Sequence, residues 1–370
     1  DHKWGYFPAV SGAWRMSQEE FIKNLNLFSD LKLRIGYGAA GNNRVGNYAS
    51  LAILGPITYP GGDSTQPGFA PTQIPNADLK WESNKTFNLG FDFGFLNQRL
   101  VVSPEFYINR SSNLLLNSRI PSSSGYKYML RNIGETENKG FDLTISSVNI
   151  DTKDFTWNTN FNISHNKNTI RALSGEDFFL EEASFGYDLK NYKVEVGKPI
   201  GQMYGYITDG LYQVSDFDYD AATQTYTLKA DVPAEGDRKN VKPGMWKFKN
   251  LDDNDVIDEN DKTVIGNAAP KFYGGLNNTF TYKGFDLSVF LTFSYGNDVF
   301  NATKLTNARG GRTNKNSLDI INSSNRWMTV NANGDIVNDP TELAALNAGK
   351  NIPAWYDLQE GSKYIHSWAV

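Results

Sequence analysis

The chain has 370 residues, a formal net charge of −5 and no cysteine. The acidic balance argues against the basic face with which proteins bind nucleic acid, so we expect no nucleic-acid partner. The lack of cysteine excludes disulfides, thiolate metal sites and a cysteine nucleophile. No run of about 18 apolar residues predicts a transmembrane helix, and no secretory signal is recognisable.

Alternating apolar and polar residues predict strands from the start of the chain. The opening DHKWGYFPAVSGAWRMS already has the pattern of a strand, whereas the closing SKYIHSWAV does not resemble the end of a domain. We therefore expect an internal piece of a longer protein. Four hairpins are predicted, the first with a helical turn between its strands. They pair residues 7–16 with 31–40, the two halves of 86–109, 138–149 with 155–165, and 273–282 with 285–295.

The second hairpin shows the alternation most clearly. In TFNLGFDFGFLNQRLVVSPEFYIN, apolar residues occupy the odd positions from Phe87 to Phe95, and after Asn97-Gln98 they occupy even positions. Because successive side chains of a strand point to opposite faces, all these aromatic rings are expected on one face. Pro104 cannot donate a ladder hydrogen bond and predicts a bulge or a local distortion.

The predicted connections between hairpins are long, whereas three of the four within hairpins are short. Soluble domains rarely contain several long loops without structure. A membrane β-barrel has short turns on one side and long loops on the other, and strands of about ten residues cross a bilayer when tilted. A soluble β-sandwich shares the alternation, but the loop lengths favour an all-β fold that is part of a large transmembrane antiparallel barrel. The long connections are 41–84, 110–134, 166–271 and 296 to the end.

In such a barrel the apolar face contacts lipid and the polar face looks into the interior. The polar positions of the predicted strands should therefore point inward. They include Asp92, Asn158, Asn160, Asn162 and Asp286.

Several segments are more specific than alternation alone. They are LKLRIGYGAAGNNRVGNYAS, LKWESNKTFNLGFDFGFLNQRL, NIGETENKGFDLTISSVN, VGKPIGQMYGYITDGLYQ and FKNLDDNDVIDENDKTVIGNAAPKFYGGLNNTFTYKGFDLSVFLTFSYGNDVFN. In order and spacing they resemble the SusC/RagA family of TonB-dependent outer-membrane transporters from Bacteroidetes-type bacteria. The resemblance covers nearly the whole chain, apart from variable loops such as 55–75 and 215–240.

The resemblance implies a barrel of about 22 strands, of which residues 1–370 would supply about eight. It implies short periplasmic turns and long extracellular loops, with 166–271 as a long extracellular region. The plug, the TonB-contacting segment and the last strands resemble nothing in this chain. The family is found in the cell outer membrane, and its partners are a SusD/RagB-like surface lipoprotein that acts as a lid and the TonB–ExbB–ExbD machinery. Its substrates are oligosaccharides or peptides.

Residues 250–261, NLDDNDVIDEND, form the densest group of oxygen ligands. With Ile257 at position eight of a calcium-binding loop, the candidate ligands fall at the required spacing. Position six, where glycine is usual, holds Asp255, and the family carries glycines at both Asp253 and Asp255. The alternative is a solvated acidic turn held by Asn and Asp side chains. The candidate Ca²⁺ ligands are Asn250, Asp252, Asn254, Asp258 and Asp261.

Residues 36–41, GYGAAG, match the dinucleotide fingerprint G-x-G-x-x-G. That fingerprint requires a helix after it, whereas the residues that follow predict a loop. A glycine-rich strand end is the favoured interpretation.

The tripeptide GFD occurs three times, at residues 90–92, 140–142 and 284–286. Each copy places Phe outward and Asp inward. A binding ladder is one interpretation, but strand alternation with glycines that ease curvature is the favoured explanation.

Catalysis finds little support in the sequence. The three histidines, His2, His165 and His366, are far apart, and no hydrolase, metalloprotease or P-loop motif is present. We expect no enzymatic activity and no catalytic residues.

Aromatic residues of the predicted extracellular loops are the candidates for substrate contact, because sugar rings stack on aromatic faces. Loop packing or contact with a lipoprotein lid is the alternative for each of them. The candidates are Tyr187, Tyr192, Tyr204, Tyr206, Tyr212, Trp246, Trp327 and Trp355.

The sequence as a whole predicts TonB-dependent import of an oligomeric nutrient. A secreted β-rich protein that binds or hydrolyses carbohydrate is the alternative, and a passive porin is a third interpretation.

Overall fold

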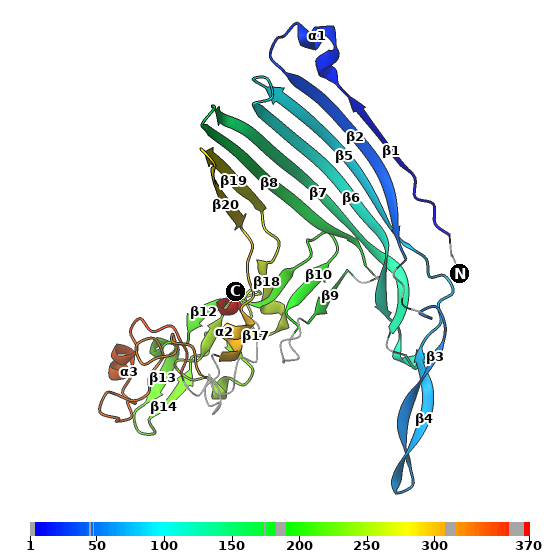
Figure 1. Ribbon diagram of the computed structural model, residues 1–370. Helices are drawn as coiled ribbons and strands as arrows, with labels where there is room; N and C mark the ends of the chain where they lie inside the picture. The colour runs from blue at the N-terminus through cyan, green and yellow to red at the C-terminus, as the bar shows by residue number, and fades with distance from the viewer. Residues whose placement is uncertain are drawn as a thin grey trace. The chain divides into compact units, whose positions relative to one another are not determined.

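The computed structural model describes residues 4–43, 46, 48–126, 128–173, 175, 177–182, 190–307, 316–354 and 366–370. All four predicted hairpins form, and they join into one eight-stranded antiparallel sheet (Figure 1). Its order is β1 (Ala9–Trp14), β2 (Asp30–Asn42), β5 (Glu82–Phe95), β6 (Leu100–Arg119), β7 (Tyr128–Asp151), β8 (Phe155–Ala172), β19 (Phe272–Tyr282) and β20 (Phe285–Tyr295).

Several strands are longer than the ten residues predicted. β6 has 20 residues and β7 has 24, so most of the connection predicted at 110–134 is paired strand. The ladder shifts register between Ser111 and Leu114 and again between Leu114 and Leu115. Each shift reverses the phase of the alternation, which is why a period of two could not be followed past Ser111.

The four connections within hairpins all lie at one end of the sheet (Figure 1). The turn predicted at Asn97-Gln98 comprises residues 96–99, and Asn97 and Gln98 have φ angles of 56° and 68°. Lys283 and Gly284, with φ of 46° and 89°, join β19 to β20, as in the two-residue turns that match strand twist. The first hairpin is closed by α1 (Glu20–Lys23), which confirms the predicted helical turn.

Pro104 interrupts the ladder without changing its register. β6 pairs with β5 at Glu105↔Gly90 and again at Val102↔Phe93, and the two rungs between are missing. A distortion was predicted and is present, but no bulge forms, because the missing N–H removes a bond without inserting a residue.

The register gives the sheet one apolar and one polar face. Residues directly opposite in an antiparallel pair share a face, so Leu33, Phe91 and Leu89 lie on the apolar side, while Asn160 and Asn277 lie on the polar side. The apolar face is not buried against other parts of the chain: 50% of Phe106 and 78% of Phe285 is exposed. A soluble sandwich would bury this face.

The segment predicted as a loop at 41–84 contains a further hairpin of β3 (Ile53–Gly61) and β4 (Ser64–Gln73). It extends from the sheet at the end opposite the turns (Figure 1). Most of its side chains are exposed, as expected of a two-stranded ribbon that packs on nothing.

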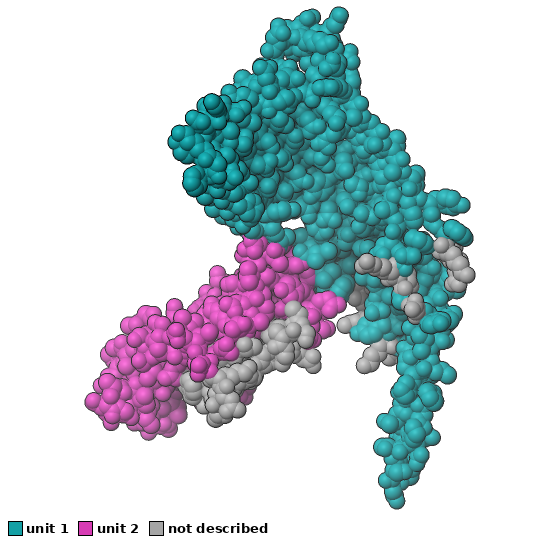
Figure 2. All heavy atoms as spheres, in the orientation of Figure 1, with its two compact units in different colours: residues 1–179, 194–200, 269–296 teal, residues 180–193, 201–268, 297–370 magenta. Residues whose placement is uncertain are grey.

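The chain divides into two compact units, shown in Figure 2. Unit 1 comprises residues 1–179, 194–200 and 269–296 and contains the large sheet; unit 2 comprises 180–193, 201–268 and 297–370. Short strands, helices and turns make up the rest of the described chain. They are β9 (Phe178–Glu181), β10 (Tyr192–Glu195), β11 (Gln202–Tyr206), β12 (Thr208–Leu211), β13 (Phe217–Asp220), β14 (Thr225–Leu228), β15 (Ala234–Glu235), β16 (Trp246–Phe248), β17 (Val256–Ile257), β18 (Lys262–Asn267), α2 (Ala302–Asn307) and α3 (Pro340–Leu346), with 3-10 turns at Met16–Gln18, Ser122–Ser124, Val214–Asp216, Arg238–Asn240, Glu259–Asp261 and Ser367–Ala369.

Unit 2, unlike the large sheet, has apolar cores. Leu211, Trp327 and Leu343 belong to one buried cluster, while Tyr212 and Phe217 belong to another. Unit 2 is therefore a folded body and not a set of open loops. Among the described residues, no helix is long and apolar enough to cross a membrane.

Candidate functional site

The polar face of the large sheet carries an ion-pair cluster on three adjacent strands. Nε of Arg34 donates to Asp92 Oδ2 at 3.0 Å, and Nη1 donates to Glu105 Oε2 at 3.1 Å. The side chains are about one-third exposed, so solvent weakens the pairs without cancelling them. Sequence inspection missed Arg34 and Glu105 because only the register of β2, β5 and β6 brings them to Asp92.

The three GFD aspartates lie on the polar face, as predicted, but in separate surroundings. Asp92 is held by Arg34. Asp142 lies opposite Glu105 in the β6–β7 register, while Asp286 accepts a hydrogen bond from Thr281 Oγ1 at 2.7 Å. No hydrogen bond joins one of these aspartates to another within the described chain, so alternation explains the repeat better than a binding ladder does.

Amide side chains form a neutral network beside the charged cluster. Asn138 Oδ1 accepts from Nδ2 of Asn166 at 3.2 Å and of Asn168 at 2.9 Å. The hydroxyl of Tyr107 donates to Asn166 Oδ1 at 3.3 Å. These groups satisfy one another across β6, β7 and β8, and they give this wall hydrogen-bonding capacity without net charge.

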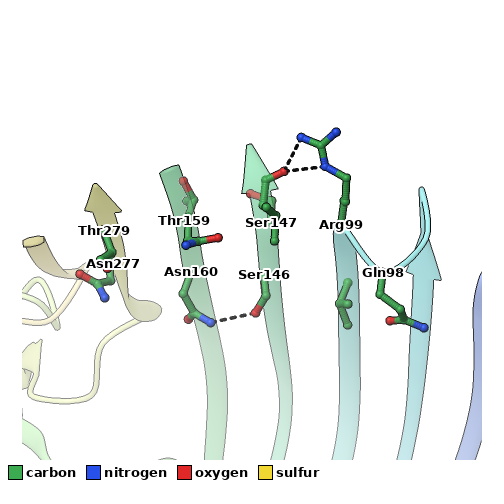
Figure 3. Close-up of a pocket in the computed structure, with 11 residues that line it drawn as sticks. Gln98, Arg99, Ser146, Ser147, Thr159, Asn160, Asn277 and Thr279 are labelled. Atoms are coloured by element: carbon green, nitrogen blue, oxygen red, sulfur yellow. Dashed lines mark hydrogen bonds between the residues drawn. The ribbon is translucent and has the colours of Figure 1, made fainter. Parts of the chain in front are cut away.

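A shallow hollow of about 210 Å³ lies at the turn end of the sheet (Figure 3). Its one charged lining residue is Arg99, whose guanidinium donates to the carbonyl oxygens of Val148 and Asn149 at 2.9–3.2 Å. Apart from Arg99, the side chains that line the hollow are uncharged. It is lined by Gln98, Arg99, Val101, Ser146, Ser147, Val148, Asn158, Thr159, Asn160, Asn277 and Thr279.

The glycine-rich stretch 36–41 lies inside β2, in an unbroken ladder with β5. The described residues between Gly41 and β3 form no helix. The expectation of a strand is confirmed, and the nucleotide fingerprint has no structural support.

The six candidate loop aromatics that the structure describes fall into two groups, one buried and one half-buried. Tyr206, Tyr212 and Trp327 are buried, and the Tyr212 hydroxyl donates to Pro233 O at 2.8 Å. Burial raises the pKa of Tyr212 far above its usual value. These three side chains pack within unit 2, which favours the alternative of loop packing for them.

Three further candidates, Tyr192, Tyr204 and Trp246, are half-buried. The Trp246 ring packs 5.1 Å from His366 and 5.5 Å from Trp368, measured between centroids. The remaining two candidates, Tyr187 and Trp355, lie outside the described residues. The contact of these candidates with a substrate stays a prediction.

Unit 2 contains a pocket of about 440 Å³ that the sequence did not reveal. Of the six predicted aromatics that the structure describes, Trp327 alone belongs to its lining. Beside it lies Tyr226, whose hydroxyl donates to Asn338 O at 2.8 Å. Burial raises the pKa of Tyr226 to about 12. Its lining residues come from four segments, 224–226, 239–243, 327–338 and Leu343 of α3, and no sequence pattern links those segments.

The acidic stretch 250–261 forms a turn-rich loop closed by Asp261. That carboxylate is fully buried and accepts the backbone N–H of Leu251 at 2.6 Å and of Asp258 at 2.8 Å. The left-handed residue of the loop is Asp253, with φ of 57°, and not Asp255. The loop therefore lacks the left-handed sixth position of the usual calcium loop.

Most of the candidate calcium ligands are occupied by hydrogen bonds inside the loop. Asp258 Oδ1 accepts from the backbone N–H of Asn260, and Asn254 Oδ1 accepts from that of Val256. Among the described residues, no group of three or more His, Cys, Asp or Glu side chains is placed to hold a metal. The arrangement fits the hydrogen-bonded acidic turn, and calcium binding stays a prediction.

Comparison with known proteins gives the fold its context. Residues 1–334 match the family described as TonB dependent receptor-like, beta-barrel. TonB-dependent receptor P3 of Formosa agariphila is 34% identical over 91% of this chain and 32% of its own length. TonB-dependent receptor SusC of Bacteroides thetaiotaomicron is 31% identical over 92% of this chain and 32% of its own length. The chain thus spans about a third of these relatives.

The solved structure described as the RagAB peptide transporter shares the fold. It aligns with 94% of this chain and 34% of its own chain, with a TM-score of 0.68 and 21% sequence identity. The chain belongs to the TonB-dependent receptor β-barrel family, and within it to the SusC/RagA type.

Membership of this family shows which face of the sheet contacts lipid and which end faces the periplasm. The protein is located in the outer membrane, the apolar face contacts lipid, and the polar face lines the barrel interior. The short connections are the periplasmic turns. The aromatic rings of Phe155, Trp157, Phe280 and Tyr282 pack together beside two of these turns, where an outer-membrane barrel carries an aromatic girdle.

Proposed function

We propose that the complete protein imports an oligomeric nutrient, an oligosaccharide or a peptide, across the outer membrane. The observation that carries the proposal is the sheet itself. The four connections within its hairpins, three of them short, lie at one end, and long segments leave the other end. Its polar face carries amide side chains and an ion-pair cluster. This is the wall of a water-filled or plugged pore.

In this proposal the substrate is first captured at the cell surface and then released through the barrel. A SusD/RagB-like lipoprotein would cover the extracellular segments, and the TonB–ExbB–ExbD machinery would supply energy through parts of the protein beyond this chain. Relatives named as receptors and transporters support a role without chemical conversion of the substrate.

The test is uptake by cells that carry the complete protein. Deletion of TonB should abolish uptake of the substrate, because a plugged barrel stays closed without energy. Deletion of the gene for the lipoprotein should weaken capture at low substrate concentration. Uptake that persists without TonB would identify a passive porin instead. The neighbouring genes would separate a glycan from a peptide substrate.

Calcium in the loop 250–261 is a separate proposal. Because the carboxylates already accept backbone N–H groups, we expect weak binding, with a dissociation constant of about 10⁻⁴–10⁻³ M, as in extracellular modules. Millimolar calcium should then raise the melting temperature of the wild type but not that of Asp258→Ala. Identical melting curves with and without calcium in both proteins would refute the site.

A further inference from the structure

The lipid-facing side of the large sheet changes from apolar to charged at its extracellular end. On β5 the apolar residues of this side run from Phe95 to Phe87, and the next residue on the same side is Lys85. At about 3.4 Å per residue and a strand tilt of about 35–45°, the ten steps from Phe95 to Lys85 rise about 24–28 Å. The apolar band of an outer-membrane barrel is about 25 Å tall. Lys85 therefore lies where the acyl chains end and the headgroups of the outer leaflet begin.

Cations occupy this level on four strands that lie side by side, β5, β6, β7 and β8 (Figure 1). Lys85 of β5 is directly opposite Arg110 of β6, and Lys139 of β7 is directly opposite Lys167 of β8. Ile108 of the apolar side is opposite Lys139, so both pairs are on the lipid-facing side. Directly opposite residues have Cβ atoms about 4.5–5.5 Å apart, and like charges in such a pair repel each other. Two repulsive pairs therefore stand next to each other on this surface.

Two glutamates balance part of this charge. Arg110 pairs with Glu135. Lys139 Nζ lies 3.1 Å from Glu137 Oε1, and Arg171 Nη2 lies 2.5 Å from the same oxygen. These contacts leave one member of each repulsive pair without a carboxylate from this group.

The remaining members are Lys85 and Lys167. Both are exposed, and neither forms an ion pair within the described part of the chain. Each of the four strands has a neighbour on both sides, because β2 and β19 flank the group. This face therefore stays turned toward the membrane in a complete barrel, and neither its exposure nor its charge results from a strand edge.

We propose that the basic surface, formed by Lys85, Arg110, Lys139, Lys167 and Arg171, binds the phosphate-bearing headgroup of lipopolysaccharide in the outer leaflet. Phosphate oxygens accept charge-assisted hydrogen bonds from Lys and Arg, and an anion between the cations would relieve the repulsion within each pair. Basic side chains beside a membrane attract anionic headgroups in this way.

The surroundings of the basic surface favour a lipid over a soluble phosphate. Phe87 and Ile108 lie opposite each other just below the cations, and they are 38% and 42% exposed. Acyl chains of a lipid held by its phosphate would cover these two side chains, whereas inorganic phosphate would leave them bare. The proposal rests on the outer-membrane location of the protein and not on the import function proposed above.

The test titrates the purified full-length protein, in detergent, with fluorescent deep-rough lipopolysaccharide and follows the anisotropy of the label. The double variant Lys85→Gln, Lys167→Gln should bind about 10- to 30-fold more weakly, because each cation beside a membrane surface contributes about a factor of five. The variant Lys85→Arg, Lys167→Arg keeps both charges and should bind as the wild type does. The matched control, Lys153→Gln with Lys283→Gln, removes two charges at the periplasmic turns and should leave binding unchanged.

Two further measurements separate the phosphate from the acyl chains and from the stability of the sheet. Dephosphorylated lipopolysaccharide should bind the wild type as weakly as the intact lipid binds the glutamine variant. Without lipid, the glutamine variant should melt at the wild-type temperature or above it, because one member of each repulsive pair is gone. Added lipopolysaccharide should then raise the melting temperature of the wild type more than that of the variant.

The proposal fails if the wild type binds intact and dephosphorylated lipid equally, or if the glutamine variant binds the intact lipid as the wild type does. Displacement of the lipid by millimolar inorganic phosphate would identify a site for free phosphate and would also overturn it. A lower melting temperature of the glutamine variant without lipid would show that the two lysines stabilise the sheet by themselves, which removes the reason for a bound anion.

Discussion

The guanidinium of Arg34 joins Asp92 of β5 to Glu105 of β6, with N–O distances of 3.0 and 3.1 Å. Two further atoms, Arg34 Nη2 and Asp92 Oδ1, are 3.3 Å apart, which makes the contact with Asp92 two-pronged. One cation thus balances two carboxylates on the wall of the barrel. The geometry suits arginine and not lysine, because only a planar fork can reach both partners.

We expect Arg34→Leu to lower the free energy of unfolding by about 1–2 kcal/mol, since it leaves two neighbouring carboxylates unbalanced. Arg34→Lys should recover part of the loss. Urea unfolding of the complete barrel in detergent measures both. Arg15→Leu is a suitable control, because that pair with Asp30 involves a side chain 62% exposed. Equal effects at residues 15 and 34 would contradict the structural role of the cluster.

A charged side chain should lower the stability of the barrel on one face of β5 and have little effect on the other face. Phe91 lies on the lipid face and Asn88 on the interior face. Phe91→Arg should cost about 2–4 kcal/mol near the bilayer midplane, whereas Asn88→Arg should be nearly neutral. The folded fraction, read by heat-dependent mobility in gels after refolding into lipid, gives the comparison. Similar losses at the two positions would show that the faces are assigned wrongly.

Asp261 should be the most sensitive residue of the acidic loop. Its buried carboxylate receives two backbone N–H groups, and Asp261→Ala would leave both donors unsatisfied at a cost of about 2–4 kcal/mol. Asp253→Gly should instead be neutral or slightly stabilising, because residue 253 is left-handed with φ of 57° and glycine adopts that conformation without strain. Thermal unfolding followed by circular dichroism tests the pair. A stable Asp261→Ala protein would mean that the loop is not held by this carboxylate.

Because His366 is buried, we expect the stability of unit 2 to depend on pH. The ring lies among Trp246, Phe248 and Trp368, and burial lowers the pKa of His366 to about 4. The unfolded chain, with an ordinary pKa of about 6.5, binds the proton first as pH falls. Stability from this group is therefore complete above pH 6.5 and is lost between pH 6.5 and 4.

The measurement compares thermal unfolding of wild type and His366→Gln across that range. The wild type should lose up to about 3 kcal/mol more than the variant. The nearby cation Lys304 is common to both proteins, so its effect cancels in the difference. Parallel pH profiles would show that His366 is not the titrating group.

The fold of unit 1 could largely be predicted from the sequence because a period of two marks each hairpin. The pairing of β7 with β8 and the common face of Asn158, Asn160 and Asn162 follow from that period alone. The extensions of β6 and β7 could not be predicted, since register shifts near Leu114 break the pattern.

The interior wall and unit 2 were less predictable for a different reason. The contact of Arg34 with Glu105 depends on which strands are neighbours, and the sequence does not state this. In unit 2 the buried cluster of Leu211, Trp327 and Leu343 joins segments more than 100 residues apart. Short strands of two to six residues leave too little periodicity to detect.

One face of β5 contacts lipid and the other faces the barrel interior, and the access of reagents to each face tests this directly. This chain has no cysteine, so single cysteines at residues 87–92 can carry a spin label without background once any cysteine elsewhere in the complete protein has been replaced. In lipid bilayers, labels at 87, 89 and 91 should be reached by dissolved oxygen and shielded from a water-soluble nickel reagent. Labels at 88, 90 and 92 should show the reverse or low access to both. Accessibility that does not alternate, or alternates with the opposite phase, would contradict the account.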